Sequence, residues 1–396
     1  MKTNLRCTGM SRKPRRIALM LDLEWPYKRH TSVFAGTQQY AEEQGWESIV
    51  DEYAYDALPL RRTKSLPYDG IVARATKALV ERAARIKVPI VNVWRSSPVQ
   101  RDLPSVFPDY QTAGRLRAEH LLSRGLRNFA TLGCRGDDAH DLETAEFRAV
   151  VEQSGFPCTM ANVSLAYSKT LAQWRKTEQS IADWMDRWKL PIGVYVGGDT
   201  MGRIVVQKCR ERGWRAPEDV AVIAGANEET LCEHPRPSLS SVEMGYERIG
   251  YEAAKLLHRM MDGKKPPSKP ILLPPQGLVV RESTDFFAVE DKLVAAALEF
   301  ISKNSHRRIG QDDVSRAVNA ETRTLQLRFR KVLDRPIATE IRRVRIERAK
   351  RELTQSNRSL SEIARDVGFG EAARMYEVFR RELDVTPSQY RKQRRA

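Results

Sequence analysis

The segment Ser359–Leu383, SLSEIARDVGFGEAARMYEVFRREL, reads as a short helix, a glycine turn and a longer helix. Ser359 and Glu362 have the spacing of a capping box, which predicts the start of the short helix. Gly368 predicts its end, because glycine readily adopts the left-handed backbone that closes many helices. Three apolar residues at helical spacing mark the buried face of the longer helix: Met375, Val378 and Phe379. The segment is expected to form a helix-turn-helix unit.

An earlier segment repeats this organisation, with a short helix expected over 311–318 and a longer one over 321–333. A helix-turn-helix unit places its second helix in the DNA major groove, where Arg and Gln side chains suit the edges of guanine and adenine. The two longer helices begin about 50 residues apart, so they could enter successive major grooves. We predict DNA contacts from both: Thr322, Arg323, Gln326, Arg328, Arg330, Ala373, Arg374 and Glu377. Glu377 could accept from cytosine, but pairing with Arg374 or Arg381 is favoured.

A long basic helix is expected between the two units, beginning at Pro336. Four arginines spread around it: Arg342, Arg343, Arg345 and Arg348. We expect about half of them to lie on a solvated helix that bridges the units, and the others to contact phosphates. The last turn of the chain is expected to begin at the pair Thr386-Pro387, with Tyr390 packed inward.

The net charge supports a polyanionic partner. The whole chain carries +16, and residues 289–396 hold 25 Lys+Arg against 16 Asp+Glu, a net of +9. A concentration of basic charge in the C-terminal quarter is typical of phosphate binding. Charge alone, however, does not choose among DNA, RNA and a membrane surface.

The residues before 286 alternate between apolar strands and helices, which indicates βαβ units with parallel sheets. We predict an α/β sensor of two lobes in series over 15–285, with a ligand cleft between the lobes, after a basic tail over 1–14. An all-α domain with the two helix-turn-helix units follows over 289–396. The expected strands are 17–23, 47–55, 70–73, 89–94, 128–133, 193–197, 220–225 and 278–281.

Polar and aromatic side chains follow several of these strands: Asp22, Tyr27, Trp94, Asp199, Asn227 and Glu228. The carboxyl ends of parallel strands share one edge of a sheet, where clefts form. Each residue alone fits equally well as a polar group that caps a loop. Together they predict the site of a small polar ligand.

Several function classes lack support in the sequence. The six histidines show no metal-ligand spacing, and neither a GxSxG nor a GxxxxGK[ST] motif occurs, so we expect no enzyme activity, metal or cofactor. Five widely spaced cysteines favour a reducing, cytoplasmic location. The apolar run Ile17–Leu21 is too short for a signal peptide or a membrane span, so no membrane partner is expected.

The C-terminal pattern resembles a known family. The spacing GF-x9-F-x7-P-x2-Y is matched by Gly368-Phe369, Phe379, Pro387 and Tyr390, and it resembles the second helix-turn-helix of the AraC family of bacterial transcription factors. The stretch Arg345–Leu353 is similar to the linker helix of that family. The resemblance covers about 100 residues and implies a DNA-binding regulator.

The upstream region resembles the sugar-sensing core of LacI-type repressors over about 265 residues. The matching stretches are Val106–Gly114, His120–Gly125, Gly197–Asp199, Pro217–Gly225 and Arg281–Thr284. The resemblance implies a periplasmic-binding-protein fold and dimerisation through the first lobe. Asn227, followed by Glu228, occupies the position of the sugar-binding aspartate of the family. The sugar-binding arginine of the family falls at Glu143, so nearby Arg148 is added to the predicted ligand residues.

The resemblance to a LacI-like sensor followed by an AraC-like DNA-binding domain implies a sugar-responsive activator of a pentose operon. The implied partners are double-stranded promoter DNA, a sugar effector, D-xylose, a second copy in a homodimer and, for an activator, RNA polymerase. A repressor, or a response to another sugar, remains open. A soluble sugar-binding protein or sugar enzyme with an incidental basic tail is the alternative from another class.

Overall fold

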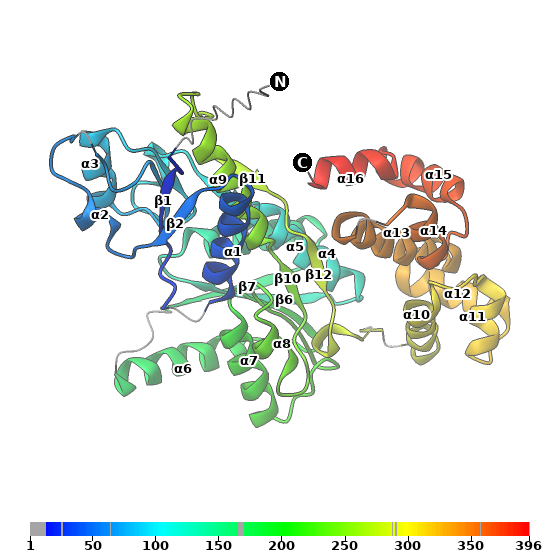
Figure 1. Ribbon diagram of the computed structural model, residues 1–396. Helices are drawn as coiled ribbons and strands as arrows, with labels where there is room; N and C mark the ends of the chain where they lie inside the picture. Colours follow the sequence, from blue (N-terminus) through cyan, green and yellow to red (C-terminus); the bar gives the residue numbers. More distant parts are fainter. Residues whose placement is uncertain are drawn as a thin grey trace, which may run out of the picture. The chain divides into compact units, whose positions relative to one another are not determined.

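The computed structural model describes residues 13–395, apart from 25–26, 64, 165–169, 287, 290 and 357 (Figure 1). Most of the predicted tail over 1–14 therefore lies outside the described residues. The chain forms two units, one of Met1–Pro108 with Gly245–Leu273 and the other of Asp109–Met244 with Pro274–Ala396. The prediction of two lobes in series is wrong in this respect, because the chain returns to the first unit after completing most of the second lobe.

The first unit is built on a parallel sheet with the strand order β2-β1-β3-β4. Its strands are β1 (Arg16–Met20), β2 (Glu47–Val50), β3 (Gly70–Ala73) and β4 (Ile90–Asn92). The β3 strand is fully buried, as expected for a strand covered on both faces. The other elements of this unit are α1 (Lys28–Glu43), α2 (Ala54–Ala57), α3 (Lys77–Ile86), η1 (Gln100–Asp102), β5 (Val106–Pro108), α9 (Tyr246–Met261) and β11 (Ile271–Leu273).

The returning helix α9 packs against α1, although more than 200 residues separate them in the sequence (Figure 1). Gly36 and Gly250 make the close approach possible. A β-carbon at Gly36 would collide with the carbonyl oxygen of Glu247, and one at Gly250 would collide with that of Val33. These two glycines therefore tie the returning segment into the first unit.

The second unit contains another parallel sheet, with the order β7-β6-β8-β9. Its strands are β6 (Asn128–Cys134), β7 (Cys158–Val163), β8 (Ile192–Val196) and β9 (Val220–Ile223). The edge strand β7 was missed from the sequence, because CTMANV is only weakly apolar and only its last residue is buried. The neighbouring elements are α4 (Tyr110–Ser123), α5 (Asp138–Gln153), α6 (Leu171–Met185), α7 (Asp199–Glu211), α8 (Glu229–Glu233), β10 (Ser241–Glu243), β12 (Gly277–Val279) and η2 (Glu282–Thr284).

The C-terminal part of this unit is all helical, as predicted. It contains α10 (Lys292–Asn304), α11 (Gln311–Ala317), α12 (Thr322–Leu333), α13 (Ile337–Gln355), α14 (Leu360–Asp366), α15 (Ala372–Leu383) and α16 (Pro387–Arg395). One apolar core surrounds Phe329 and another surrounds Phe379, so each helix-turn-helix unit has its own core. The capping box of Ser359 and Glu362 is present, and Tyr390 packs edge-on against Phe379.

The arginines of α13 are bound within the protein, more fully than the sequence predicted. Arg345 donates to the carbonyl oxygens of Ser305, Arg307 and Ile309, which follow α10, and Arg348 donates to that of Ser302. Two further arginines form ion pairs, Arg343 with buried Glu340 and Arg342 with Glu382. The expectation that about half of them contact phosphates is corrected, because each one has a partner in its own chain.

In the described ranges of the chain, no helix combines the length and the apolar character that a membrane crossing requires.

Candidate ligand-binding and DNA-binding sites

Two predicted ligand residues meet at the carboxyl edge of the first sheet. Asp22 follows β1, and Trp94 follows β4. Between them lies Arg74, which follows β3, forms an ion pair with Asp22 and places its guanidinium carbon 4.6 Å from the centre of the Trp94 ring. The sequence interpretation missed Arg74, although its position directly after a buried strand was the same signal that selected Asp22. A carboxylate, a guanidinium and an indole therefore form one cluster at the point where the strand order reverses.

Hydrogen bonds to Glu52 and His30 fix the backbone around Asp22. Asp22 has the left-handed φ of 55°, which aspartate tolerates better than most residues. Its amide donates to the Glu52 carboxylate at 2.8 Å, and its carbonyl oxygen lies 2.8 Å from Nδ1 of His30. Burial lowers the pKa of His30 to about 4, with a further contribution from Arg29, so its ring is neutral at neutral pH. Tyr27 lies beside this support, with its ring edge-on to that of His30.

The predicted residues of the second sheet have a different environment. Asp199 is buried at the start of α7, and its carboxylate accepts from the amides of Ala226 and Glu228 and from the hydroxyl of Ser241. These bonds fix the loop after β9. The structure thus brings Asp199 together with the loop of Asn227 and Glu228, as predicted, but its oxygens accept bonds from its own chain.

Asn227 also bonds to its own chain. It has the left-handed φ of 61° and is buried. Its side-chain nitrogen donates to Glu243 at 2.9 Å, and its side-chain oxygen accepts from Arg281 at 2.8 Å. The sequence left open that each of these residues is a polar group that caps a loop. Asp199 and Asn227 have this role in the structure.

A buried ion pair lies beneath this loop. Glu143, at the position of the family's arginine, pairs with Arg117 at 3.2 Å and accepts from the hydroxyl of Tyr195. Arg117 also donates to the carbonyl oxygen of Gly225 at 2.8 Å, which anchors the end of β9. Burial opposes the charge of Arg117, but Glu143, Tyr195 and Asp199 together outweigh it, so the pKa of Arg117 lies above its usual value. The carboxylate of Glu143 is therefore compensated by a guanidinium inside the protein.

The structure gives no support to the ligand role predicted for Arg148. Its side chain is 49% exposed on α5 and pairs with Glu152 at 2.7 Å. It also contacts Met160, and it interacts electrostatically with Cys158, the first residue of β7. Arg148 therefore lies toward the amino ends of the strands, whereas Asp199 and Asn227 follow their carboxyl ends.

The first predicted recognition helix, α12, presents its polar residues as expected. Thr322 and Gln326 bond back to the preceding helix, to Asp312 at 3.3 Å and Gln311 at 2.8 Å. Arg323 and Arg330 are exposed, and their side chains form no hydrogen bond or ion pair with any described residue. Two arginines are therefore available on this face for a polyanionic partner.

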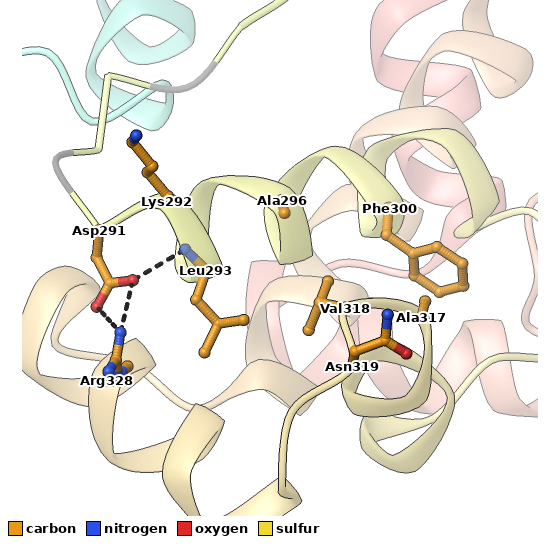
Figure 2. A pocket seen from close by; sticks show the side chains of 9 residues that line it. All are labelled: Asp291, Lys292, Leu293, Ala296, Phe300, Ala317, Val318, Asn319 and Arg328. Carbon is orange, nitrogen blue, oxygen red and sulfur yellow. Dashed lines mark hydrogen bonds and ion pairs between the residues drawn. The ribbon is translucent and has the colours of Figure 1, made fainter.

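Arg328 lies on another face of α12, and its DNA role is not supported. At about 100° per residue, it lies roughly 150° around the helix from Arg323 and Arg330. It instead pairs with Asp291 at 3.3 Å, the residue that caps α10 (Figure 2). Both residues line an open pocket of about 890 Å³, whose lining also includes Leu293 and Phe300 (Figure 2).

In the second recognition helix, α15, the predicted residues Ala373, Arg374 and Glu377 are all exposed. Glu377 forms no ion pair with Arg374 or Arg381, although all three belong to the described part of the chain, and Arg381 pairs with Glu382 instead. The favoured pairing of Glu377 is therefore wrong. Sequence reasoning also passed over two exposed apolar residues on these helices, Leu327 and Tyr376.

Comparisons with known proteins also divide the chain into an α/β part and a C-terminal helix-turn-helix part. Residues 118–284 match a periplasmic binding protein-like domain, and residues 314–393 match a helix-turn-helix domain. The chain is 27% identical to the xylose operon regulatory protein of Haemophilus influenzae, over 95% of this chain and 98% of that protein. It is 28% identical to the protein of the same name from Escherichia coli strain K12, over 96% of this chain and 98% of the relative.

Solved structures give the same result. The structure of a xylose-binding transcription activator superposes with a TM-score of 0.58 at 26% identity, covering 96% of this chain and 98% of that one. A complex of the regulator CelR with cellobiose, at 21% identity and a TM-score of 0.56, shares the sensor fold over 68% of this chain and 85% of that one. The chain thus has the architecture of these regulators, a periplasmic-binding-protein-like domain followed by a helix-turn-helix domain, and its full-length relatives are regulators rather than enzymes.

Proposed function

We propose that this regulator is an activator whose sensor binds D-xylose and thereby tightens the grip of its paired helix-turn-helix units on promoter DNA. The relatives that match along almost the whole chain carry xylose in their names, which supports the choice of sugar. A regulator of this kind acts in the cytoplasm, where the chromosomal DNA lies.

The observation that carries the sugar-binding part is the cluster of Asp22, Arg74 and Trp94. A sugar hydroxyl both donates and accepts hydrogen bonds, so a carboxylate and a guanidinium side by side match its two functions. An indole ring supplies the apolar surface on which the C–H face of a sugar packs. The three groups converge at a sheet edge of the kind that binds ligands in open α/β folds.

Calorimetry against a panel of pentoses and hexoses tests the sugar. We expect binding of D-xylose, with at least a tenfold loss of affinity in Asp22→Asn and in Trp94→Ala. Asp56→Asn is the matched control, because Asp56 belongs to the same unit and its carboxylate is exposed. The absence of heat with every pentose would reject the pentose, and equal losses in all three variants would reject the assignment of the cluster.

Titration of labelled promoter DNA, with and without D-xylose, tests the regulatory part. The sugar must bind more tightly to the DNA-bound state, since a ligand shifts an equilibrium only by its differential affinity. Arg323→Ala should cost about 1–3 kcal/mol at the cognate site and leave sugar affinity unchanged. Lys303→Ala, which removes an exposed positive charge from α10, is the control. Full-strength specific binding by Arg323→Ala contradicts the assignment of α12.

We further propose a homodimer that contacts RNA polymerase. The first unit exposes apolar side chains near its edge strand β2, with Tyr53 at 72% and Leu60 and Val50 beside it in the sequence. Tyr53→Asp with Leu60→Asp should lower the molar mass measured by light scattering, whereas Leu171→Asp on α6 should not. Transcription in vitro with purified polymerase then fixes the sign, and reduced transcript with D-xylose would indicate a repressor.

A further inference from the structure

The recognition helix α12 carries a large apolar side chain where its polar residues were expected to dominate. Leu327 is 65% exposed, more than most apolar residues in the described part of the chain. A single exposed leucine is ordinary on a protein surface. What distinguishes Leu327 is its position among the residues that we assign to DNA.

Leu327 points directly away from the domain core. The buried stripe of α12 is formed by Leu325, Phe329 and the half-buried Val332. At about 100° per residue, the centre of that stripe lies roughly 170° from Leu327. Leu327 is thus the residue closest to the middle of the outward face, with Arg323 one turn before it and Arg330 one turn after it.

The second recognition helix shows that the fold does not require an apolar residue at this position. The two helices have the same length, and the buried Leu325 and Phe329 correspond to Met375 and Phe379, so position 327 corresponds to position 377. The helix α15 differs in that it also buries Val378. Glu377 is exposed there without disturbing the packing of Phe379. Leu327 is therefore not needed for the packing of the domain core. In the free protein its apolar side chain is exposed to water, which is unfavourable in free energy.

We propose that Leu327 is a specificity-determining residue that reads a thymine by packing on its C5 methyl group. This inference rests on the proposed DNA-binding function. When a recognition helix enters the major groove, the middle of its outward face approaches the base edges, and flanking arginines reach phosphates or guanines. The thymine methyl is the apolar group that unmodified bases present there, so a leucine at this position gains most over a T·A pair.

Selection from random duplex DNA tests the proposal with the full chain. The wild type, Leu327→Ala and Leu171→Ala are each put through the same selection. Alanine preserves helix propensity, and Leu171, 64% exposed on α6, is the matched control. We expect the wild type and Leu171→Ala to select the same motif, and Leu327→Ala to lose a thymine at one position of each half-site.

Deoxyuridine then isolates the methyl group. Replacing the selected thymine by deoxyuridine should weaken wild-type binding about fourfold, the value of one buried methyl-sized group, and should leave Leu327→Ala unchanged. If the wild type selects no motif, the proposed DNA-binding function itself fails. If a motif is selected but Leu327→Ala keeps every thymine, or if deoxyuridine weakens both proteins equally, the role of Leu327 is overturned.

Discussion

The carboxyl edges of the two parallel sheets arise from one sequence pattern but end in opposite states. After the first sheet, Arg74 contacts both Asp22 and Trp94, and all three side chains remain partly exposed. After the second sheet, Asp199 and Asn227 are buried and bonded to their own loop. Polar residues at the ends of parallel strands are therefore candidates for a ligand site, and their hydrogen-bond partners separate binding groups from groups that only shape the edge.

The comparison also assigns different roles to the two edges. Buried hydrogen bonds of Asp199 and Asn227 fix the carboxyl edge of the second sheet in the absence of a ligand, so the shape of this edge is preformed. The first edge carries the charged and aromatic groups that a sugar would engage. Substitutions in the second edge should mainly change stability, whereas substitutions in the first should mainly change binding.

The largest effect is expected from Arg117→Met. The change leaves the Glu143 carboxylate buried without its partner and releases the carbonyl oxygen of Gly225, which should cost about 3–5 kcal/mol of unfolding free energy. Urea unfolding measures the loss, and hydrogen exchange locates it in the second lobe. The double variant Arg117→Met with Glu143→Leu should recover much of it, because no unpaired charge remains. A loss below about 1 kcal/mol in the single variant would contradict the fixed second edge.

Asp199→Ala should cost about 2–4 kcal/mol, because two amides and the Ser241 hydroxyl lose their acceptor. Asp186→Ala, at an exposed ion pair of the same unit, should change the unfolding free energy by less than about 1 kcal/mol. Equal urea midpoints for the two variants would show that the loop after β9 does not depend on Asp199.

The stability that His30 contributes beside Asp22, at the carboxyl edge of the first sheet, should depend on pH. The folded pKa of His30 is about 4, below the ordinary value of 6.5, so the unfolded chain binds the proton first. Its stabilising contribution is complete above pH 6.5 and is lost as the pH falls from 6.5 through about 4. The loss should reach about 3 kcal/mol. His30→Gln should flatten this part of the stability profile, and His306→Gln, at an exposed position, should leave it unchanged. A profile that keeps its slope in His30→Gln would contradict the burial of a neutral ring.

The smallest stability effect is expected from Asp22→Asn. The ion pair with Arg74 is partly exposed, so its loss should change the unfolding free energy by less than about 1 kcal/mol. Asparagine also tolerates the left-handed backbone at this position. Thermal unfolding without sugar measures this effect. A cost comparable to that of Asp199→Ala would erase the difference between the two edges.

The sequence alone predicted both helix-turn-helix units, because each local signal agreed with the next. The capping box of Ser359, the turn at Gly368 and the apolar spacing of α15 all act within a few residues of one another. The strands β1, β3, β8 and β9 were predicted for the same reason, since a buried parallel strand appears as a continuous apolar run. The weakly apolar edge strand β7 lacked that signal and was missed.

What only the tertiary structure decided are the pairings between distant residues. The sequence placed Asp22, Trp94, Asp199 and Asn227 at strand ends, but it could not show that Arg74 joins the first two while Ser241 and Arg281 bond to the others. Nor could it show that α9 belongs to the first unit. Hydrophobic periodicity and capping are local properties of the chain, whereas burial and hydrogen-bond partners depend on which segments meet in space.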